Sequence, residues 1–301
     1  MIYYDKITDI FCLVDEFCAE YDKIVEKHLL GNPSKRPSIM SRSEVITLNI
    51  LFHISGFRNF KHFYIFYVQK HMKNDFPYTV SYNRFTELMQ QNLLAMSLFL
   101  KTCCMGDCTG ISFIDSTPIR VCKNKRIKCN KVFKGIATTG KSTMGWFHGF
   151  KLHIIINDKG ELLNFTITAA NVDDRTPLKD NSFIKNIFGK LYADKGYIGK
   201  DLWNNLFDNG VHLVTYLKKN MKNVLMPLKD KILLRKRSVI ETVNDELKNI
   251  CQIEHSRHRS LGNFLTNLIS GLIAYTFFPK KPSIKYDVIK NNKQQQLTLF
   301  F

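Results

Sequence analysis

Residues 111–116 read Ile-Ser-Phe-Ile-Asp-Ser, a short apolar run that ends on a carboxylate. Such a run is typical of a buried β-strand, and residues 119–122 extend it. A carboxylate that leaves a rigid sheet where the apolar core stops is well placed for chemistry. We therefore expect the fold to be built around this strand, with Asp115 at its functional end.

The elements expected after this strand alternate in type. They are a Lys-rich loop over 123–145, a hairpin of strands over 147–156 and 161–168, a helix over 176–187, a strand over 189–193, a further helix, a strand over 211–217, and a helix over about 235–250. Three strands followed by alternating helices and strands indicate an α/β class, an RNase H-like mixed sheet with helices on both faces.

The first hundred residues predict an all-helical N-terminal domain. Residues 3–29 have apolar side chains at three- and four-residue intervals, a break follows at 31–37, and a second helix is expected after Ser41 or Ser43. An aromatic segment and a helix over about 82–101 complete it. Its basic clusters suit recognition of a DNA end, and its apolar faces suit dimerisation equally well. The expected domains are residues 1–105 (helical), 106–280 (catalytic) and 281–301 (a polar tail).

The charge balance favours a polyanionic partner. Lys and Arg number 44 against 26 Asp and Glu, for a net charge of +18, and each phosphate that a cation neutralises releases counterions. A Lys-rich proteome would give a similar composition. The chain opens with no secretory pattern, and the apolar run 264–278 is too short and too polar to cross a bilayer. We expect a cytoplasmic protein that binds nucleic acid and no membrane.

Three carboxylates are candidates for a metal site. Asp115 and Asp194 each follow an apolar run, and Glu241 lies beside the apolar stripe of its predicted helix, on the same flank as Arg237 and Lys248. Carboxylate oxygens are the ligands that Mg²⁺ prefers, and two-metal phosphoryl transfer needs several of them around cations about 4 Å apart. The alternative for Glu241 is an ordinary solvated face with Arg–Glu pairing at i, i+4.

Several motifs resemble those of bacterial insertion-sequence DDE transposases. These are Asp115-Ser116-Thr117-Pro118, the stretch Asn171 to Asp174, Asp194-Lys195-Gly196-Tyr197, and Arg237, Glu241 and Lys248 at the spacing of a Tyr-Arg-Glu-Lys signature. Residues 140–143, 241–245 and 255–260 resemble the insertion-sequence nine-eight-two family in particular. The resemblance spans nearly the whole chain. It departs from the signature at Leu234, where the wider family has Tyr.

The resemblance implies an endonuclease and DNA strand transferase with two Mg²⁺ or Mn²⁺ ions. Asp115, Asp194 and Glu241 would be its catalytic and metal-binding residues. Its partners would be double-stranded transposon ends and target DNA, with a homodimer in the synaptic complex. The residues expected to bind DNA are Arg237, Lys248, Lys141, Lys236, Arg257 and Arg259.

Other functions fit parts of the sequence. A structure-selective nuclease of the same fold would use the same carboxylates without strand transfer, and a domesticated DNA-binding protein would lack activity. Residues 135–142 also match the phosphate-binding pattern Gly-x-x-x-x-Gly-Lys-Ser. That reading is disfavoured because no helix pattern follows Lys141 and no apolar strand precedes the loop.

Overall fold

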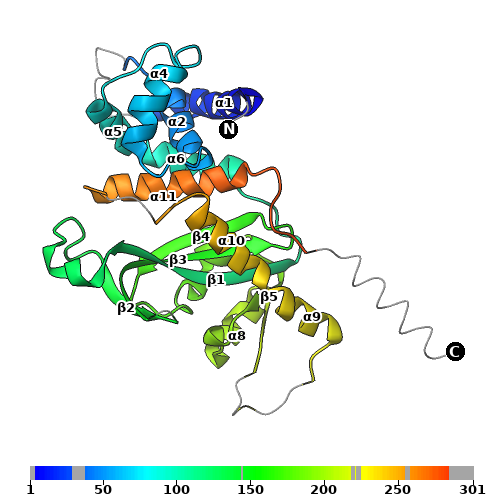
Figure 1. Cartoon of the computed structure of the whole chain (residues 1–301). Coiled ribbons are helices and arrows are strands. Elements are labelled where there is room, and N and C mark those ends of the chain that lie inside the picture. The colour runs from blue at the N-terminus through cyan, green and yellow to red at the C-terminus, as the bar shows by residue number, and fades with distance from the viewer. Residues whose placement is uncertain are drawn as a thin grey trace. The chain divides into compact units, whose positions relative to one another are not determined.

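The computed structural model describes residues 4–28, 38–143, 145–217, 221, 225–254 and 258–284 (Figure 1). The chain divides into two compact units. We name them the helical unit, residues 1–104, 125–135 and 245–278, and the sheet unit, residues 105–124, 136–244 and 279–301. The domain limits expected from the sequence stay predictions.

The helical unit begins with the long helix α1 (Tyr4–His28) and α2 (Arg42–Ile54). Ser41 caps α2, since its hydroxyl accepts from the Glu44 amide while the Glu44 carboxylate accepts from the Ser41 amide. The other elements described in it are α3 (Phe60–His62), a π-helix (Phe63–Val68), α4 (Gln69–His71), α5 (Tyr82–Gln91), α6 (Leu93–Phe99), a second π-helix (Leu100–Cys104), most of a 3-10 helix (Asn124–Cys129) and α11 (Leu261–Thr276). The expected helical N-terminal region is confirmed.

Helix α11 contacts several other helices of this unit. Most of its side chains are buried, and it packs against α2, α5 and α6 (Figure 1). A helix that is buried over most of its surface is apolar on most of its sides. Over the described residues, no helix combines the length and the apolar character needed to cross a membrane.

Among its described residues, the sheet unit holds six strands. They are β1 (Ile111–Cys122), β2 (Thr138–Ser142), β3 (Gly145–Asn157), β4 (Leu162–Ala169), β5 (Gly189–Ala193) and β6 (Val211–Thr215). β1 lies antiparallel to β3 and parallel to β5, and β6 is parallel to β5. β2 and β4 both pair with β3, each antiparallel. The result is the mixed α/β sheet expected from the sequence.

Strand β2 lies inside the stretch that the sequence predicts to be a loop, so that prediction is wrong for residues 138–142. Gly140 lies so close to a neighbouring backbone that a Cβ there would clash with the carbonyl oxygen of Ala170. Gly140 and Lys141 therefore belong to a strand that a further strand follows. A phosphate-binding loop would instead lead into a helix.

The helices of the sheet unit differ in detail from the predicted ones. Residues 176–187 form only a 3-10 turn (Pro177–Lys179) and α7 (Asn181–Ile184). Helix α8 (Lys200–Asp208) joins β5 to β6, with the 3-10 turn Lys195–Tyr197 before it. The helix predicted over about 235–250 corresponds to α10 (Ser238–Asn249). It is preceded by α9 (Leu228–Lys236), which was not predicted, and Arg237 separates the two.

The core of the sheet unit fixes its strands. A buried cluster includes Ile114, Ile155 and Leu191 from the strands with Leu202 and Leu206 from α8. The neighbouring residues of β1 and β5 have side chains on the opposite face, where Phe113 and Tyr192 stack with ring centroids 5.5 Å apart. The strand ends that carry Asp115 and Asp194 are therefore anchored on both faces.

Candidate active site

Asp115 and Asp194 lie on neighbouring parallel strands. Phe113 of β1 pairs with Tyr192 of β5, and continuing this register by two residues brings Asp115 beside Asp194. Side chains alternate along a strand, so both carboxylates share the face of Phe113 and Tyr192. Asp194 follows the last residue of β5, as predicted. Asp115 instead lies within β1, just past the residues of β1 that pair with β5.

The carboxylate of Asp115 has two partners from the C-terminal part of the sheet unit. Asn244 Nδ2 donates a hydrogen bond of 3.0 Å to Asp115 Oδ2. Arg237 Nη1 lies 3.8 Å from Asp115 Oδ1. Burial raises the pKa of Asp115 to about 6; Arg237 opposes this rise, and the charges of Glu241 and Asp194 add to it. Asp115 therefore shares one electrostatic site with Glu241 and Asp194.

Arg237 connects Asp115 to Glu241. Its Nη2 lies 2.8 Å from Glu241 Oε1, and its side chain is only 15% exposed, against 57% for Glu241. The i, i+4 pair of Arg237 and Glu241, expected if this were an ordinary solvated helix face, is therefore present. A solvated face alone would not explain why the Arg237 guanidinium also lies near Asp115. Arg237 provides the positive charge that two nearby carboxylates need.

The donor set suits a hard divalent cation, because it consists of carboxylate oxygens on rigid elements with a cation compensating their charge. Within the described ranges, however, no group of three or more His, Cys, Asp or Glu side chains is arranged closely enough to hold a metal ion. The residues fit Mg²⁺ or Mn²⁺ in their chemistry, and Asp115, Asp194 and Glu241 would have to converge further to bind it.

Two side chains of this region were not assigned a role from the sequence. Asn244 is 7% exposed and lies on the same flank of α10 as Glu241. That shared flank is the one feature of the sequence that could have indicated a role for it. Tyr197, in the turn after Asp194, is 2% exposed, and its hydroxyl is buried. Burial, with the charges of Asp115 and Asp174, raises the pKa of Tyr197 well above its usual value.

The residues expected to bind DNA lie on different elements. Lys141 on β2, Lys236 at the end of α9, and Arg259 are exposed. Lys248 on α10 lies 3.7 Å from Glu254, and Arg257 lies outside the described residues. Leu234, at the position of the signature Tyr, is 2% exposed on α9 and offers no polar group to a ligand.

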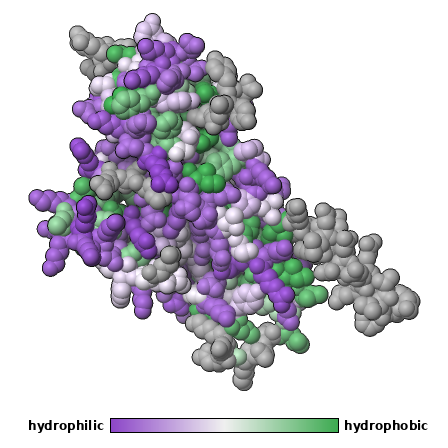
Figure 2. Space-filling model, in the orientation of Figure 1, coloured by the Kyte–Doolittle hydropathy of each residue, from purple (hydrophilic) through white to green (hydrophobic). Residues whose placement is uncertain are grey.

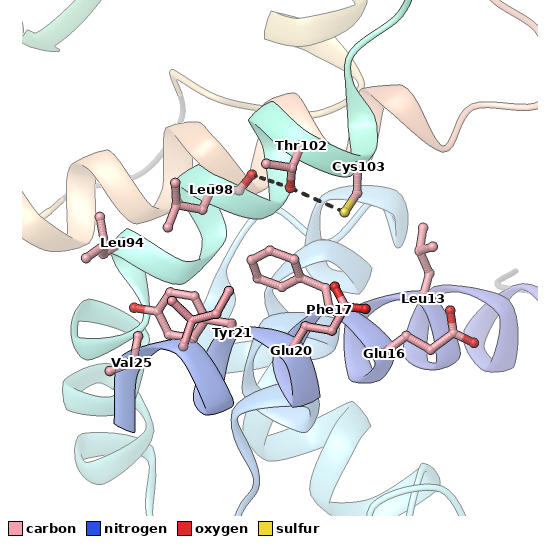
Figure 3. Close-up of a pocket in the computed structure, with 11 residues that line it drawn as sticks. Leu13, Glu16, Phe17, Glu20, Tyr21, Val25, Leu94, Leu98, Thr102 and Cys103 are labelled. Carbon is pink, nitrogen blue, oxygen red and sulfur yellow. Dashed lines mark hydrogen bonds between the residues drawn. The ribbon is translucent and has the colours of Figure 1, made fainter. Parts of the chain in front are cut away.

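An apolar groove in the helical unit is separate from these residues. It has a volume of about 670 Å³ and is lined mainly by α1 and α6, including Phe17, Tyr21, Leu94 and Leu98 (Figure 3). None of the candidate site residues that the structure describes lines it. By contrast, much of the surface seen in Figure 2 is hydrophilic.

A mixed sheet with this strand arrangement, carboxylates on two adjacent strands and a third on a following helix, defines the RNase H-like class of enzymes that act on nucleic acids. The model of the family described as "Transposase DDE domain" matches residues 105–261, just over half of the 301-residue chain. The chain belongs to this family and is a transposase, an enzyme of DNA recombination that depends on divalent metal. A search of curated proteins gives no match. The resemblance to the nine-eight-two family stays a prediction.

Proposed function

We propose that this transposase binds the ends of its insertion sequence, cleaves them to expose a 3′-OH, and joins that 3′-OH to target DNA. The observation that carries the proposal is the set of contacts around Asp115. Asp115 lies next to Asp194 by strand register, and Arg237 links it to Glu241. The same three carboxylates would serve both reactions, since each is an in-line transfer at phosphorus.

Asp115, Asp194 and Glu241 would hold two Mg²⁺ or Mn²⁺ ions. When bound, these ions supply the positive charge that makes a water or a 3′-OH nucleophilic and stabilises the transition state. Arg237 offsets part of the negative charge of Asp115 and Glu241. Because a guanidinium fits a phosphate as well as a carboxylate, Arg237 can also hold the DNA backbone beside the cut.

The other proposed DNA contacts are cationic and independent of base sequence. They would fix the register of the duplex without reading it. We propose that a homodimer pairs two transposon ends, with the helical N-terminal region serving either end recognition or dimerisation. The proposed contacts are Lys141, Lys236, Lys248, Arg257 and Arg259.

The test is a cleavage and strand-transfer assay with Mg²⁺ or Mn²⁺ on duplexes that carry the element's ends. Asp115→Asn and Glu241→Gln should each lower the cleavage rate by about 10³-fold or more while DNA binding persists. Asp245→Asn is the matched control, since Asp245 is an exposed carboxylate on the same helix α10. If either site variant cleaves like the wild type, the site assignment is wrong.

The products separate this proposal from its rivals. A joined transposon–target product supports strand transfer, whereas cleavage without joining would indicate a structure-selective nuclease. Binding of the ends with no cleavage by the wild-type protein would indicate a domesticated DNA-binding protein.

A further inference from the structure

Trp146 is an exposed aromatic residue at the start of β3. Its side chain is 62% exposed, which is unusual for so large an apolar ring. Lys141 of β2 pairs with it across the hairpin, and the Lys141 ammonium lies 6.0 Å from the centre of the ring. Asn124 Nδ2 donates a hydrogen bond of 2.9 Å to the Trp146 carbonyl. The backbone of Trp146 is thus fixed while its ring remains open to a ligand.

The register places Trp146 on the face of the sheet that carries Asp115. Asp115 pairs with Ile154 of β3, and residues at even intervals along β3 share a face, so Trp146, His148 and Ile154 lie on one side. Eight residues separate Trp146 from Ile154, a path of at most about 27 Å along the strand. The side chains between them on this face, Phe150, Leu152 and Ile154, are buried. A ligand that contacts both Trp146 and Asp115 must therefore be long enough to span the elements that cover these side chains, as a DNA duplex is.

The groups around Trp146 favour DNA over an apolar protein partner. The side chains beside this end of β3 are polar: Lys141 and Thr139 lie on the paired strand β2, and Asn124 bonds the Trp146 carbonyl. The chain as a whole carries a net charge of +18. The second tryptophan, Trp203 on α8, differs because its ring stacks on Phe207 with centroids 5.1 Å apart. A lone exposed ring beside an ammonium suits a nucleotide, whose base or sugar contacts the ring while its phosphate contacts the cation.

We propose that Trp146 and Lys141 form a subsite of the protein that binds one nucleotide of the transposon-end DNA. The indole contacts a base or sugar, and Lys141 contacts the adjoining phosphate. At about 3.4 Å per base pair, the distance along β3 places this subsite up to about eight base pairs from the cleavage point. The proposal rests on the proposed function, because it takes the DNA at Asp115 to be the DNA that reaches Trp146.

Intrinsic fluorescence tests the contact directly, since Trp146 and Trp203 are the two tryptophans of the chain. In Trp203→Phe, only Trp146 emits, and transposon-end DNA should quench or shift that emission. In Trp146→Phe, only Trp203 emits, and the same DNA should leave the emission unchanged. Unchanged emission of Trp146 at saturating DNA would overturn the proposal.

Affinity and its salt dependence separate the two side chains. Trp146→Ala should weaken end binding by about tenfold, within the range measured for loss of one aromatic stacking contact, with the slope of log affinity against log salt unchanged. Lys141→Ala should reduce that slope by about one. Trp203→Ala is the matched control. Since Trp146 is exposed, its variants should unfold like the wild type, and Trp146→Phe should keep most of the affinity.

The failures of the two proposals are distinguishable. If Asp115→Asn abolishes cleavage but Trp146→Ala binds like the wild type, this subsite is wrong and the proposed function stands. If Asp115→Asn cleaves normally while DNA still quenches Trp146, the catalytic assignment is wrong and the contact stands. Duplexes that extend about eight base pairs from the cut should already bind Trp146→Ala more weakly than the wild type; a difference that appears only with longer duplexes would contradict the proposed position.

Discussion

Asn244 Nδ2 donates a hydrogen bond of 3.0 Å to Oδ2 of Asp115, across 129 residues of sequence. The contact joins α10 to β1 and leaves the other oxygen of Asp115 toward Arg237. A carboxylate that is oriented before its ligand arrives loses less conformational freedom on binding. Asn244 is therefore a positioning residue in the proposed site.

Replacing Asn244 should impair cleavage more than folding. We expect Asn244→Ala to lower the cleavage rate by about 10- to 100-fold, the effect typical of losing a partner that orients a metal ligand. Asn244→Asp should be at least as harmful, because it places a like charge beside Asp115. The measurement is the single-turnover cleavage rate. Asn249→Ala, at the exposed end of the same helix, is the control, and an equal loss in both would refute the positioning role.

Removing Arg237 should separate metal binding from catalysis. Arg237→Ala leaves Asp115 and Glu241 without their neutralising partner, so the protein should gain more thermal stability from added Mn²⁺ than the wild type does. Cleavage should still fall by about 100-fold, because the phosphate contact proposed for Arg237 would be lost. Thermal unfolding with and without Mn²⁺ gives the first result and the cleavage assay the second. Lys236→Ala should show the wild-type response to metal; no extra stabilisation in Arg237→Ala would contradict the interpretation.

The strands that carry Asp115 and Asp194 could be predicted because each is a short apolar run, and such a pattern is local. Strand β2 could not be predicted in this way. Residues 138–142 read Thr-Thr-Gly-Lys-Ser and have no apolar alternation. Their extended conformation comes from pairing with β3 and from the close approach of Gly140 to the Ala170 carbonyl, both of which depend on the tertiary structure.

The contacts in the candidate site also divide into those that follow from local sequence spacing and those that depend on the tertiary structure. The pairing of Arg237 with Glu241 follows from helical spacing, so the sequence predicts it. The contacts of Arg237 and Asn244 with Asp115 depend on how α10 crosses the sheet, which no local pattern reveals. The break between α9 and α10 at Arg237 was also hidden, since residues 228–249 contain no Gly or Pro to signal it.

The stability of the protein should fall between pH 7 and pH 5 in part because of His53. Burial lowers the pKa of His53 to about 4, while its Nδ1 lies 2.5 Å from the Cys251 carbonyl. The folded state therefore takes up its proton at lower pH than the unfolded state. The contribution of His53 is complete above about pH 6.5 and is lost as the pH falls toward 4.

Between pH 7.5 and pH 5.0, protonation of His53 should lower the free energy of unfolding by about 2 kcal/mol. Urea unfolding at the two pH values measures it. His53→Gln keeps a side-chain donor but cannot titrate, so its loss of stability between the two values should be smaller by about that amount. Burial, together with the charge of His53, also lowers the pKa of His258 to about 4, so His258 titrates in both proteins and its contribution becomes smaller when His53 is replaced. An equal loss in variant and wild type would show that His53 is not buried in its neutral form.

Asp230 should prove important for stability because it ties α9 to the strand that leads to Asp194. Its carboxylate accepts hydrogen bonds of 2.7 and 2.8 Å from Lys190 Nζ and of 2.8 Å from the buried Tyr192 hydroxyl. Lys190 is 41% exposed, so solvent screens its share. Asp230→Ala leaves the Tyr192 hydroxyl without its acceptor, and we expect a loss of about 2 kcal/mol in the free energy of unfolding.

Urea unfolding of three variants tests this role of Asp230. Asp230→Asn keeps an acceptor oxygen and should lose less stability than Asp230→Ala. Asp208→Ala, at the exposed end of α8, should change the free energy of unfolding by no more than about 0.5 kcal/mol. Because α9 leads into Arg237 and α10, Asp230→Ala should also slow cleavage at temperatures where it is fully folded. Asp230→Ala as stable as Asp208→Ala would mean that the contacts with Lys190 and Tyr192 do not hold α9 to β5 in solution.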